Sequence, residues 1–162
     1  MNVTTHRAFG YLTQRTVFQD GEVHTVSLPA NRQWYNYCTK GSFLTIYNHP
    51  LAKHLEPPML TGDWNGPDVF ATFSGKTEHT ATGETVIWCV GSELNNNYLP
   101  DCEKWFLANG QSQTLPVGTK LFFAQGNLTI NGANINTPTQ VRVKTTDTTV
   151  TANEDCYGIL FL

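Results

Sequence analysis

Short runs of β-branched and aromatic residues, separated by turn residues, cover most of this chain. They span residues 11–19, 22–28, 33–38, 43–47, 69–73, 85–90, 103–108, 111–115, 119–124, 127–130, 140–144, 148–150 and 157–162. Residues that favour helices are sparse, and no extended apolar repeat has the 3.6-residue period of a helix. The pattern predicts an all-β protein, a β-sandwich or jelly-roll-like barrel of about a dozen short antiparallel strands joined by tight hairpins.

Glycine-containing dipeptides mark the expected turns. Asp20-Gly21 lies between two of the runs, and a two-residue Asp-Gly loop suits the type I′ turn, whose twist matches that of paired strands. Asn109-Gly110 stands in the same position between 103–108 and 111–115, and Asn131-Gly132 follows 127–130. Gln125-Gly126 separates two further runs. We therefore expect hairpins at these positions.

A chain of 162 residues predicts one β domain over residues 1–162.

Two segments depart from the regular alternation of short strands and turns. Residues 48–68 contain four prolines and predict a long loop, which either packs over one end of the barrel or contacts a partner. Residues 1–10 contain few apolar side chains and predict either a disordered tail or an extended arm that adds an edge strand to a neighbouring subunit.

The charge balance narrows the functional classes. Ten basic and 13 acidic residues give a net charge of −3, so we expect no binding to nucleic acid, which usually requires a basic face. No apolar run approaches the length of a membrane span, and the first 30 residues show no signal peptide, so we expect no membrane association. Instead, 23 threonines and 14 asparagines supply uncharged hydrogen-bonding groups.

Candidate chemistry is sparse. The four cysteines lie at least 13 positions apart, without a Cys-x-x-Cys pair, so buried reduced thiols are the first interpretation and disulfides the alternative. His49, His54 and Glu56 cluster in the proline-rich segment, but a helical zinc motif needs histidines four residues apart. We expect solvated histidines there, with no metal or other cofactor. No motif of a known reaction is present, which predicts a protein that is not an enzyme.

Residues Gly110–Gln125 resemble the second conserved motif of the cupins, small proteins with a double-stranded β-helix. Gly110, Pro116 and Gly118 have the motif's spacing. Leu121 stands where the motif has its metal-binding histidine, and Gln125 stands where it has asparagine. The resemblance therefore supports a jelly-roll topology, while the leucine argues against a cupin metalloenzyme.

Two aromatic segments are candidate contact surfaces. Trp64, flanked by Asp63 and Asn65, combines a flat apolar face with polar groups, as glycan sites do. The segment Trp34–Tyr37 has a similar composition, but its side chains alternate between two faces of a strand, so at least one aromatic pair should belong to the core.

In overall character the chain resembles the small all-β structural proteins of tailed-phage virions, such as capsid decoration (cement) proteins and tail components. The resemblance implies a non-enzymatic protein of the virion, assembled in the host cytoplasm as a symmetric homotrimer that contacts the major capsid protein or another virion protein. Two alternatives remain open: a cupin-like protein that binds a small molecule or a metal, and a carbohydrate-binding β-sandwich module.

Overall fold

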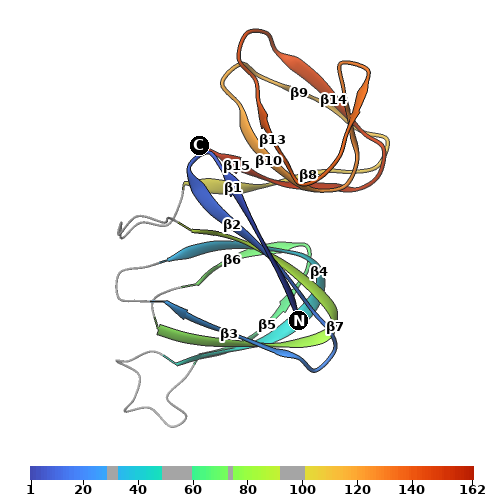
Figure 1. Ribbon diagram of the computed structural model, residues 1–162. Helices are drawn as coiled ribbons and strands as arrows, with labels where there is room; N and C mark the ends of the chain where they lie inside the picture. Colours follow the sequence, from blue (N-terminus) through green and yellow to red (C-terminus); the bar gives the residue numbers. More distant parts are fainter. Residues whose placement is uncertain (29–32, 49–59, 73–74, 92–100) are drawn as a thin grey trace. The chain divides into compact units, whose positions relative to one another are not determined.

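The computed structural model describes residues 1–28, 33–48, 60–72, 75–91 and 101–162. Their regular secondary structure consists of fifteen β-strands (Figure 1). The contacts within the chain divide it into two compact units, Met1–Pro100 and Asp101–Leu162. We expected one β domain over the whole length, and we describe the two units separately.

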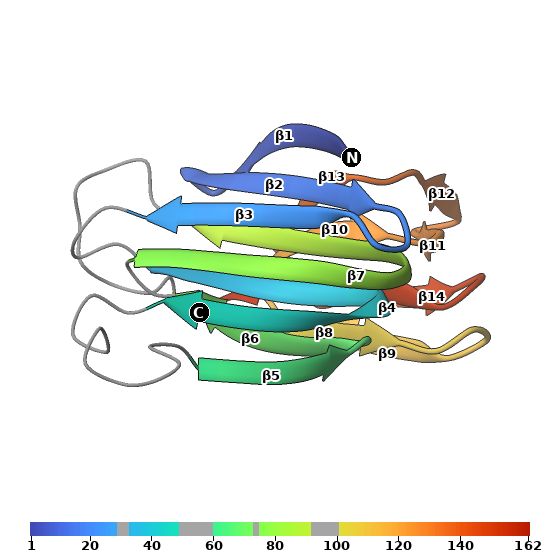
Figure 2. The ribbon, with the colours of Figure 1, turned by 90° about the horizontal axis from the view of Figure 1, so that it is seen from below.

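The Met1–Pro100 unit contains one antiparallel sheet of seven strands, in which the long strands β4 and β7 lie side by side (Figure 2). The main path through the sheet is β1-β2-β7-β4-β5, with β3 also paired to β7 and β6 also paired to β4. The strands are β1 (Asn2–Ala8), β2 (Tyr11–Phe18), β3 (Val23–Leu28), β4 (Trp34–Asn48), β5 (Leu60–Asn65), β6 (Asp68–Thr72) and β7 (Gly75–Gly91).

The Asp101–Leu162 unit contains two four-stranded antiparallel sheets, β13-β10-β15-β8 and β12-β11-β14-β9. Its core is apolar and includes Trp105, Phe123 and Val150. The strands are β8 (Cys102–Leu107), β9 (Ser112–Leu115), β10 (Lys120–Gln125), β11 (Leu128–Ile130), β12 (Ala133–Ile135), β13 (Thr139–Arg142), β14 (Thr148–Ala152) and β15 (Cys156–Phe161). The prediction of an all-β, jelly-roll-like fold is confirmed. Such a fold follows from the sequence pattern, because alternating apolar residues in short runs can bury one face of each strand.

All four expected hairpins can be compared with the strand pairing, and the one at Gln125-Gly126 is wrong because β10 and β11 belong to different sheets. Asn131-Gly132 joins the paired strands β11 and β12, and both residues have the positive φ of a type I′ turn. At Asp20-Gly21 and Asn109-Gly110 the tight turns form, with hydrogen bonds of 3.0 Å from Glu22 N–H to the Gln19 carbonyl and from Gln111 N–H to the Ala108 carbonyl, but the prediction that the flanking strands pair with each other is wrong. Strands β2 and β3 both pair with β7, at its two halves, while β8 and β9 belong to different sheets. Strand β7, with 17 residues, is long enough to pair with β2 and β3 one after the other along its length.

The N-terminal residues form neither a tail nor an arm that leaves the unit. Strand β1 pairs with β2 along its whole length, and the two-residue turn between them is Phe9-Gly10, both with positive φ. Phenylalanine rarely adopts this conformation, so the turn escaped the sequence analysis. Strand β1 is the edge strand of this sheet, and most of its side chains are exposed.

The predicted proline-rich loop at 48–68 is shorter than expected. Residues 60–65 form β5, which pairs with β4 from Ser42↔Asn65 to Tyr47↔Leu60. Residues 49–59 lie outside the described residues. Strand β4 also merges the two runs expected at 33–38 and 43–47, because the register shifts between Cys38 and Ser42 let the strand bend without ending.

Gly41 lies within this irregular part of β4 and provides a test of the bend. Its φ is +81°, and a Cβ atom there would collide with the carbonyl oxygen of Glu84 and come within 2.9 Å of the Cα of Thr85. Gly83 has a similar φ of +73° but open space around it. We expect Gly41→Ala to lower the free energy of unfolding by about 2 kcal/mol more than Gly83→Ala, measured by chemical denaturation, because only Gly41→Ala adds a backbone collision to the φ strain. Equal losses would contradict this account of the bend.

Among the described residues there is no helix with the length and hydropathy needed to cross a membrane.

Candidate functional site

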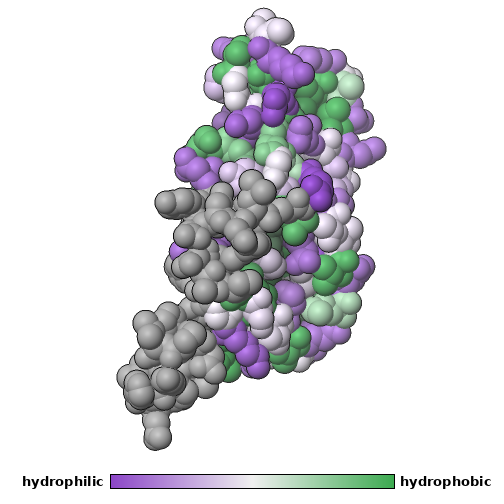
Figure 3. Space-filling model, turned by 60° about the vertical axis from the view of Figure 1, so that its left-hand side comes forward, coloured by the Kyte–Doolittle hydropathy of each residue, from purple (hydrophilic) through white to green (hydrophobic). Residues whose placement is uncertain are grey.

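The two units differ sharply in the polarity of their interiors. Among the described residues, nine polar side chains are buried, and all nine belong to the Met1–Pro100 unit: Thr13, Thr16, His24, Asn36, Thr39, Thr72, Thr77, His79 and Thr85. Burying a polar group costs free energy unless the group is paired. A buried polar side chain without a partner is therefore a candidate functional group. In the view of Figure 3, polar and apolar side chains are interspersed over the visible surface of the described residues.

His24 is placed in this interior by the alternation of β3. Along the strand, His24, Val26 and Leu28 are buried while the residues between them are exposed. Directly opposite His24, on β7, lies His79, and the two rings are stacked with centroids 6.3 Å apart. Neither ring nitrogen of His24 has a hydrogen-bond partner in the described part of the chain.

His79 is held by one hydroxyl and two aromatic rings. Its Nδ1 lies 2.9 Å from the Oγ1 of Thr45, which pairs with it across β4 and β7. The rings of Phe43 and Phe70 contact it edge to face, at centroid distances of 4.9 and 5.6 Å. These contacts fix the ring orientation of His79 and leave His24 as the less constrained member of the pair.

Burial keeps both imidazoles neutral at pH 7. Desolvation lowers the pKa of His24, and desolvation together with the nearby His24 lowers the pKa of His79 to about 4. A neutral imidazole carries one N–H donor and one nitrogen acceptor. His24 therefore offers both kinds of hydrogen-bonding group inside an aromatic environment, since the ring of Phe18 lies 6.1 Å from it.

The other buried polar side chains of this interior fall into two groups. The amide nitrogen of Asn36 is paired, because it donates to the carbonyl oxygen of Phe70 at 3.3 Å and to the Oγ1 of Thr72 at 2.8 Å. The hydroxyls of Thr16 and Thr77 instead have no hydrogen-bond partner among the described residues. The unpaired groups share the core face of the sheet with His24, whereas the Asn36 contacts stabilise the pairing of β4 and β6.

No protein-family model matches this sequence, and no curated protein sequence matches it. Solved structures do resemble the fold. HutD from Pseudomonas fluorescens SBW25 matches with a TM-score of 0.58 at 17% identity, covering 94% of this chain and 79% of HutD. The pirin YhhW from Escherichia coli, solved in complex with nickel(II), matches with a TM-score of 0.59 at 12% identity, covering 93% and 80%. The protein PA5104 from Pseudomonas aeruginosa PAO1 matches with a TM-score of 0.59 at 14% identity, covering 98% and 85%.

The chain shares the all-β, jelly-roll-like fold of these solved structures. The interpretation as a tailed-phage capsid decoration or tail protein is wrong, because the resemblance on which it rested was one of composition, whereas the likeness in structure extends over almost the whole chain. At such low identities the likeness concerns the fold alone. The expectations of a homotrimer and of contact with a capsid or other virion protein are not tested by it.

The cupin-like segment Gly110–Gln125 does adopt the strand-turn-strand form that its spacing predicted. It comprises β9, the turn at Pro116–Thr119 and β10. Leu121, at the motif's histidine position, is completely buried in the apolar core of its unit. Apolar side chains therefore surround the position at which the cupin motif has its histidine, and the residues here do not fit a metal ion.

The polar interior of the Met1–Pro100 unit offers two imidazoles. Catalytic and structural metal sites usually use three or four protein ligands. Within the described ranges, no group of three His, Cys, Asp or Glu side chains lies close enough to hold a metal ion. The described residues around His24 and His79 thus do not form a complete metal site. The candidate cluster His49, His54 and Glu56 lies outside the described residues.

The aromatic candidates from the sequence have separate places in the fold. Trp64, Asp63 and Asn65 lie on β5, opposite Phe43, Leu44 and Ser42 of β4. In the segment Trp34–Tyr37, both tyrosines are buried, as expected for one aromatic pair. A glycan contact through Trp64, Asp63 and Asn65 stays a prediction.

The cysteines are free thiols, and three of the four are buried. Burial raises the pKa of Cys38 to about 11 and those of Cys89 and Cys102 to about 12, so these thiols are protonated at neutral pH. A thiol in this state is a poor nucleophile.

The sequence analysis missed His24 and His79 because it searched for histidines close together along the chain. The alternation Val-His-Thr-Val-Ser-Leu in 23–28 already places His24 on the same face as two apolar residues. That pattern alone indicates a buried histidine. The proximity of His79 depends on the register between β3 and β7, which the sequence does not reveal.

Proposed function

We propose that this protein binds a small, uncharged organic molecule in the core of the Met1–Pro100 unit, with His24 as the principal hydrogen-bonding group. The observation that carries the proposal is the burial of His24 with both ring nitrogens unpaired among the described residues. Leaving a buried donor and acceptor unpaired costs about 1–3 kcal/mol for each group. A ligand that pairs with them recovers this free energy on binding.

The surroundings of His24 suggest the chemistry of the ligand. The rings of Phe18 and His79, with centroids 6.1 and 6.3 Å from that of His24, favour a planar group. Burial disfavours charge, as the lowered pKa values of both histidines indicate, so a neutral ligand with a donor and an acceptor suits the site better than an ion. The hydroxyl of Thr77, on the same face of β7 as His79, could supply a further hydrogen bond.

We also propose that binding occurs without turnover. A general base or acid works best when its pKa lies near the working pH. Burial moves the pKa of both imidazoles away from neutrality, and the contacts of His79 are a hydroxyl and aromatic rings. Such a pair is suited to positioning a neutral molecule.

The experiment is a binding screen with the full chain by ligand-observed and protein-observed NMR, using benzamide, phenol and nicotinamide as neutral planar probes. We expect at least one probe to bind with a Kd in the millimolar range and to shift the His24 ring resonances. His24→Phe keeps an aromatic ring but removes both nitrogens, and it should weaken this binding about tenfold or more. His6→Phe, on the edge strand β1, is the matched control and should leave the affinity unchanged.

Two results would overturn the proposal. One is that His24→Phe and His6→Phe bind the probes equally well, which would place the binding elsewhere. The other is stoichiometric, micromolar binding of Ni²⁺ or Zn²⁺ that depends on His24, measured by calorimetry on metal-free protein. That outcome would make the site a metal centre completed by residues outside the described ranges.

A further inference from the structure

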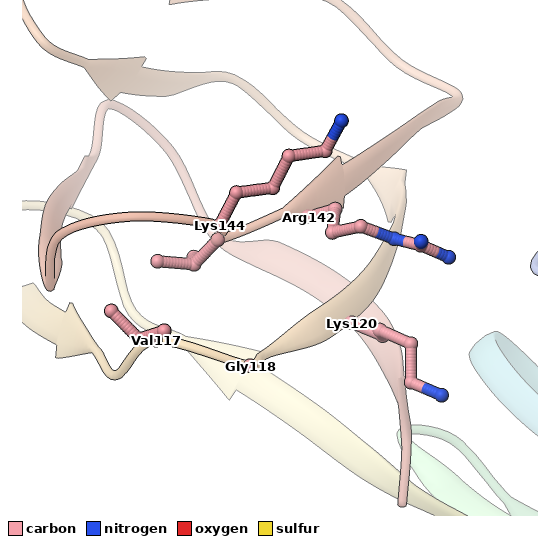
Figure 4. A pocket seen from close by; sticks show the side chains of 6 residues that line it. Val117, Gly118, Lys120, Arg142 and Lys144 are labelled. Carbon is pink, nitrogen blue, oxygen red and sulfur yellow. The ribbon is translucent and has the colours of Figure 1, made fainter.

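The Asp101–Leu162 unit has a second candidate site, independent of the histidine pair and of the function proposed for it. A pocket of about 290 Å³ lies beside the start of β10 and the end of β13 (Figure 4). Six residues line it: Val117, Gly118, Lys120, Arg142, Val143 and Lys144. Three of them are cations, and no carboxylate is among the six.

The strand register brings these cations together. Lys120 and Arg142 are direct cross-strand neighbours in the antiparallel pair of β10 and β13. Hydrogen bonds from the Gly118 N–H to the Val143 carbonyl (2.8 Å) and from the Val143 N–H to the Thr119 carbonyl (3.0 Å) extend this pairing beyond the strands. The extension fixes the backbone up to Lys144.

Alternation along the chain separates apolar from charged side chains. Val143 is buried in the core of the unit, while its neighbours Arg142 and Lys144 are exposed. In Figure 4 the side chains of Lys120 and Arg142 extend to the same side, and the side chain of Lys144 extends from the same strand end in another direction. Val117, half exposed, adds an apolar wall.

The concentration of charge is unusual for this chain. The sequence from 101 to 162 contains four basic residues, Lys104, Lys120, Arg142 and Lys144, and three of them line this one pocket. Like charges placed directly opposite each other on neighbouring strands destabilise a sheet. Asp147, close along the chain, uses its Oδ1 to accept the Val117 N–H at 2.9 Å. The lining of the pocket therefore contains three basic side chains and no acidic one.

We propose that this pocket binds a small phosphate monoester. A guanidinium group binds phosphate oxygens through a planar fork, and two ammonium groups add positive charge that matches a dianion. Val117 provides contact for a short apolar group on the ester. The volume lies near the lower limit for small-molecule sites, which fits a ligand of this size.

The test is calorimetric and NMR titration of the full chain with phenyl phosphate, inorganic phosphate and phenol. We expect phenyl phosphate to bind more tightly than inorganic phosphate, phenol not to bind at this pocket, and the affinity to fall as salt is added. Backbone resonances of 117–120 and 142–144 should shift. Arg142→Lys, which keeps the charge but loses the fork, and Lys144→Gln, on an exposed position after β13, should each raise the Kd about tenfold.

Lys76→Gln is the matched control, because Lys76 is an exposed lysine of the other unit that is ion-paired with Glu78 at 3.0 Å. It should leave the affinity unchanged. The proposal is overturned if phenyl phosphate shows no saturable binding below about 10 mM. It is also overturned if Lys76→Gln weakens binding as much as Lys144→Gln does, since the effect would then be one of net charge.

Discussion

Replacing Leu121 by alanine is expected to lower the free energy of unfolding of the Asp101–Leu162 unit by about 2–5 kcal/mol. Leu121 is completely buried and belongs to the same apolar core as Trp105, Phe123 and Val150. Removing three carbons there loses their transfer free energy and leaves a cavity that rigid neighbouring strands fill only in part. Amide hydrogen exchange of β10 and β15 measures the effect within this unit, whatever the behaviour of the other one.

Val117→Ala is the control for this experiment. Val117 precedes β10 by three residues and is half exposed, so the same kind of truncation should change the stability by about 0.5 kcal/mol or less. Similar exchange rates in Leu121→Ala and Val117→Ala would refute the assignment of Leu121 to the core.

Leu121→His, which introduces the residue of the cupin motif, should also destabilise the unit and should not create a metal site, because the neighbouring side chains are apolar.

Acidification is expected to destabilise the Met1–Pro100 unit through His79. In the unfolded chain this imidazole has its ordinary pKa near 6.5, whereas in the fold the pKa is about 4 because burial and the neighbouring His24 disfavour the charged ring. The unfolded state therefore binds the proton first as the pH falls. The stability contributed by neutral His79 is complete above pH 6.5 and is lost between pH 6.5 and 4. Between pH 7.5 and 4.5 the loss from this group should be about 2–3 kcal/mol.

Guanidinium unfolding of the wild type and of His79→Gln at the two pH values isolates this contribution from that of the carboxylates. The variant is expected to be less stable at pH 7.5, where the contact with Thr45 is lost, but its further loss at pH 4.5 should be smaller than that of the wild type by about 2–3 kcal/mol. The His79 ring resonances should not titrate above about pH 5. Titration near pH 6.5 would show that the ring is not buried as described.

The two sites make different demands on the fold. The histidine pair needs the buried face of a sheet, where hydrogen bonds and aromatic contacts are strong because water is excluded. The cationic pocket needs an exposed strand end, where three basic side chains are accessible to a soluble anion. The predicted pH and salt responses therefore differ, and each site can be tested without disturbing the other.

The sequence by itself determined the class of fold, the position of most strands and the exclusion of a metal ligand at Leu121, because these depend on local alternation and on the identity of single residues. It also determined the type I′ turn at Asn131-Gly132, whose backbone conformation is intrinsic to the dipeptide. The tertiary structure alone decided which strands pair. Strands β2 and β3, which Asp20-Gly21 connects, pair with two different parts of β7 and not with each other. The pairing of β3 with β7 places His24 opposite His79. The pairing of β10 with β13 sets Lys120 opposite Arg142. Pairing over long sequence separations depends on the summed contacts of whole strands, and no short pattern in the chain encodes that sum.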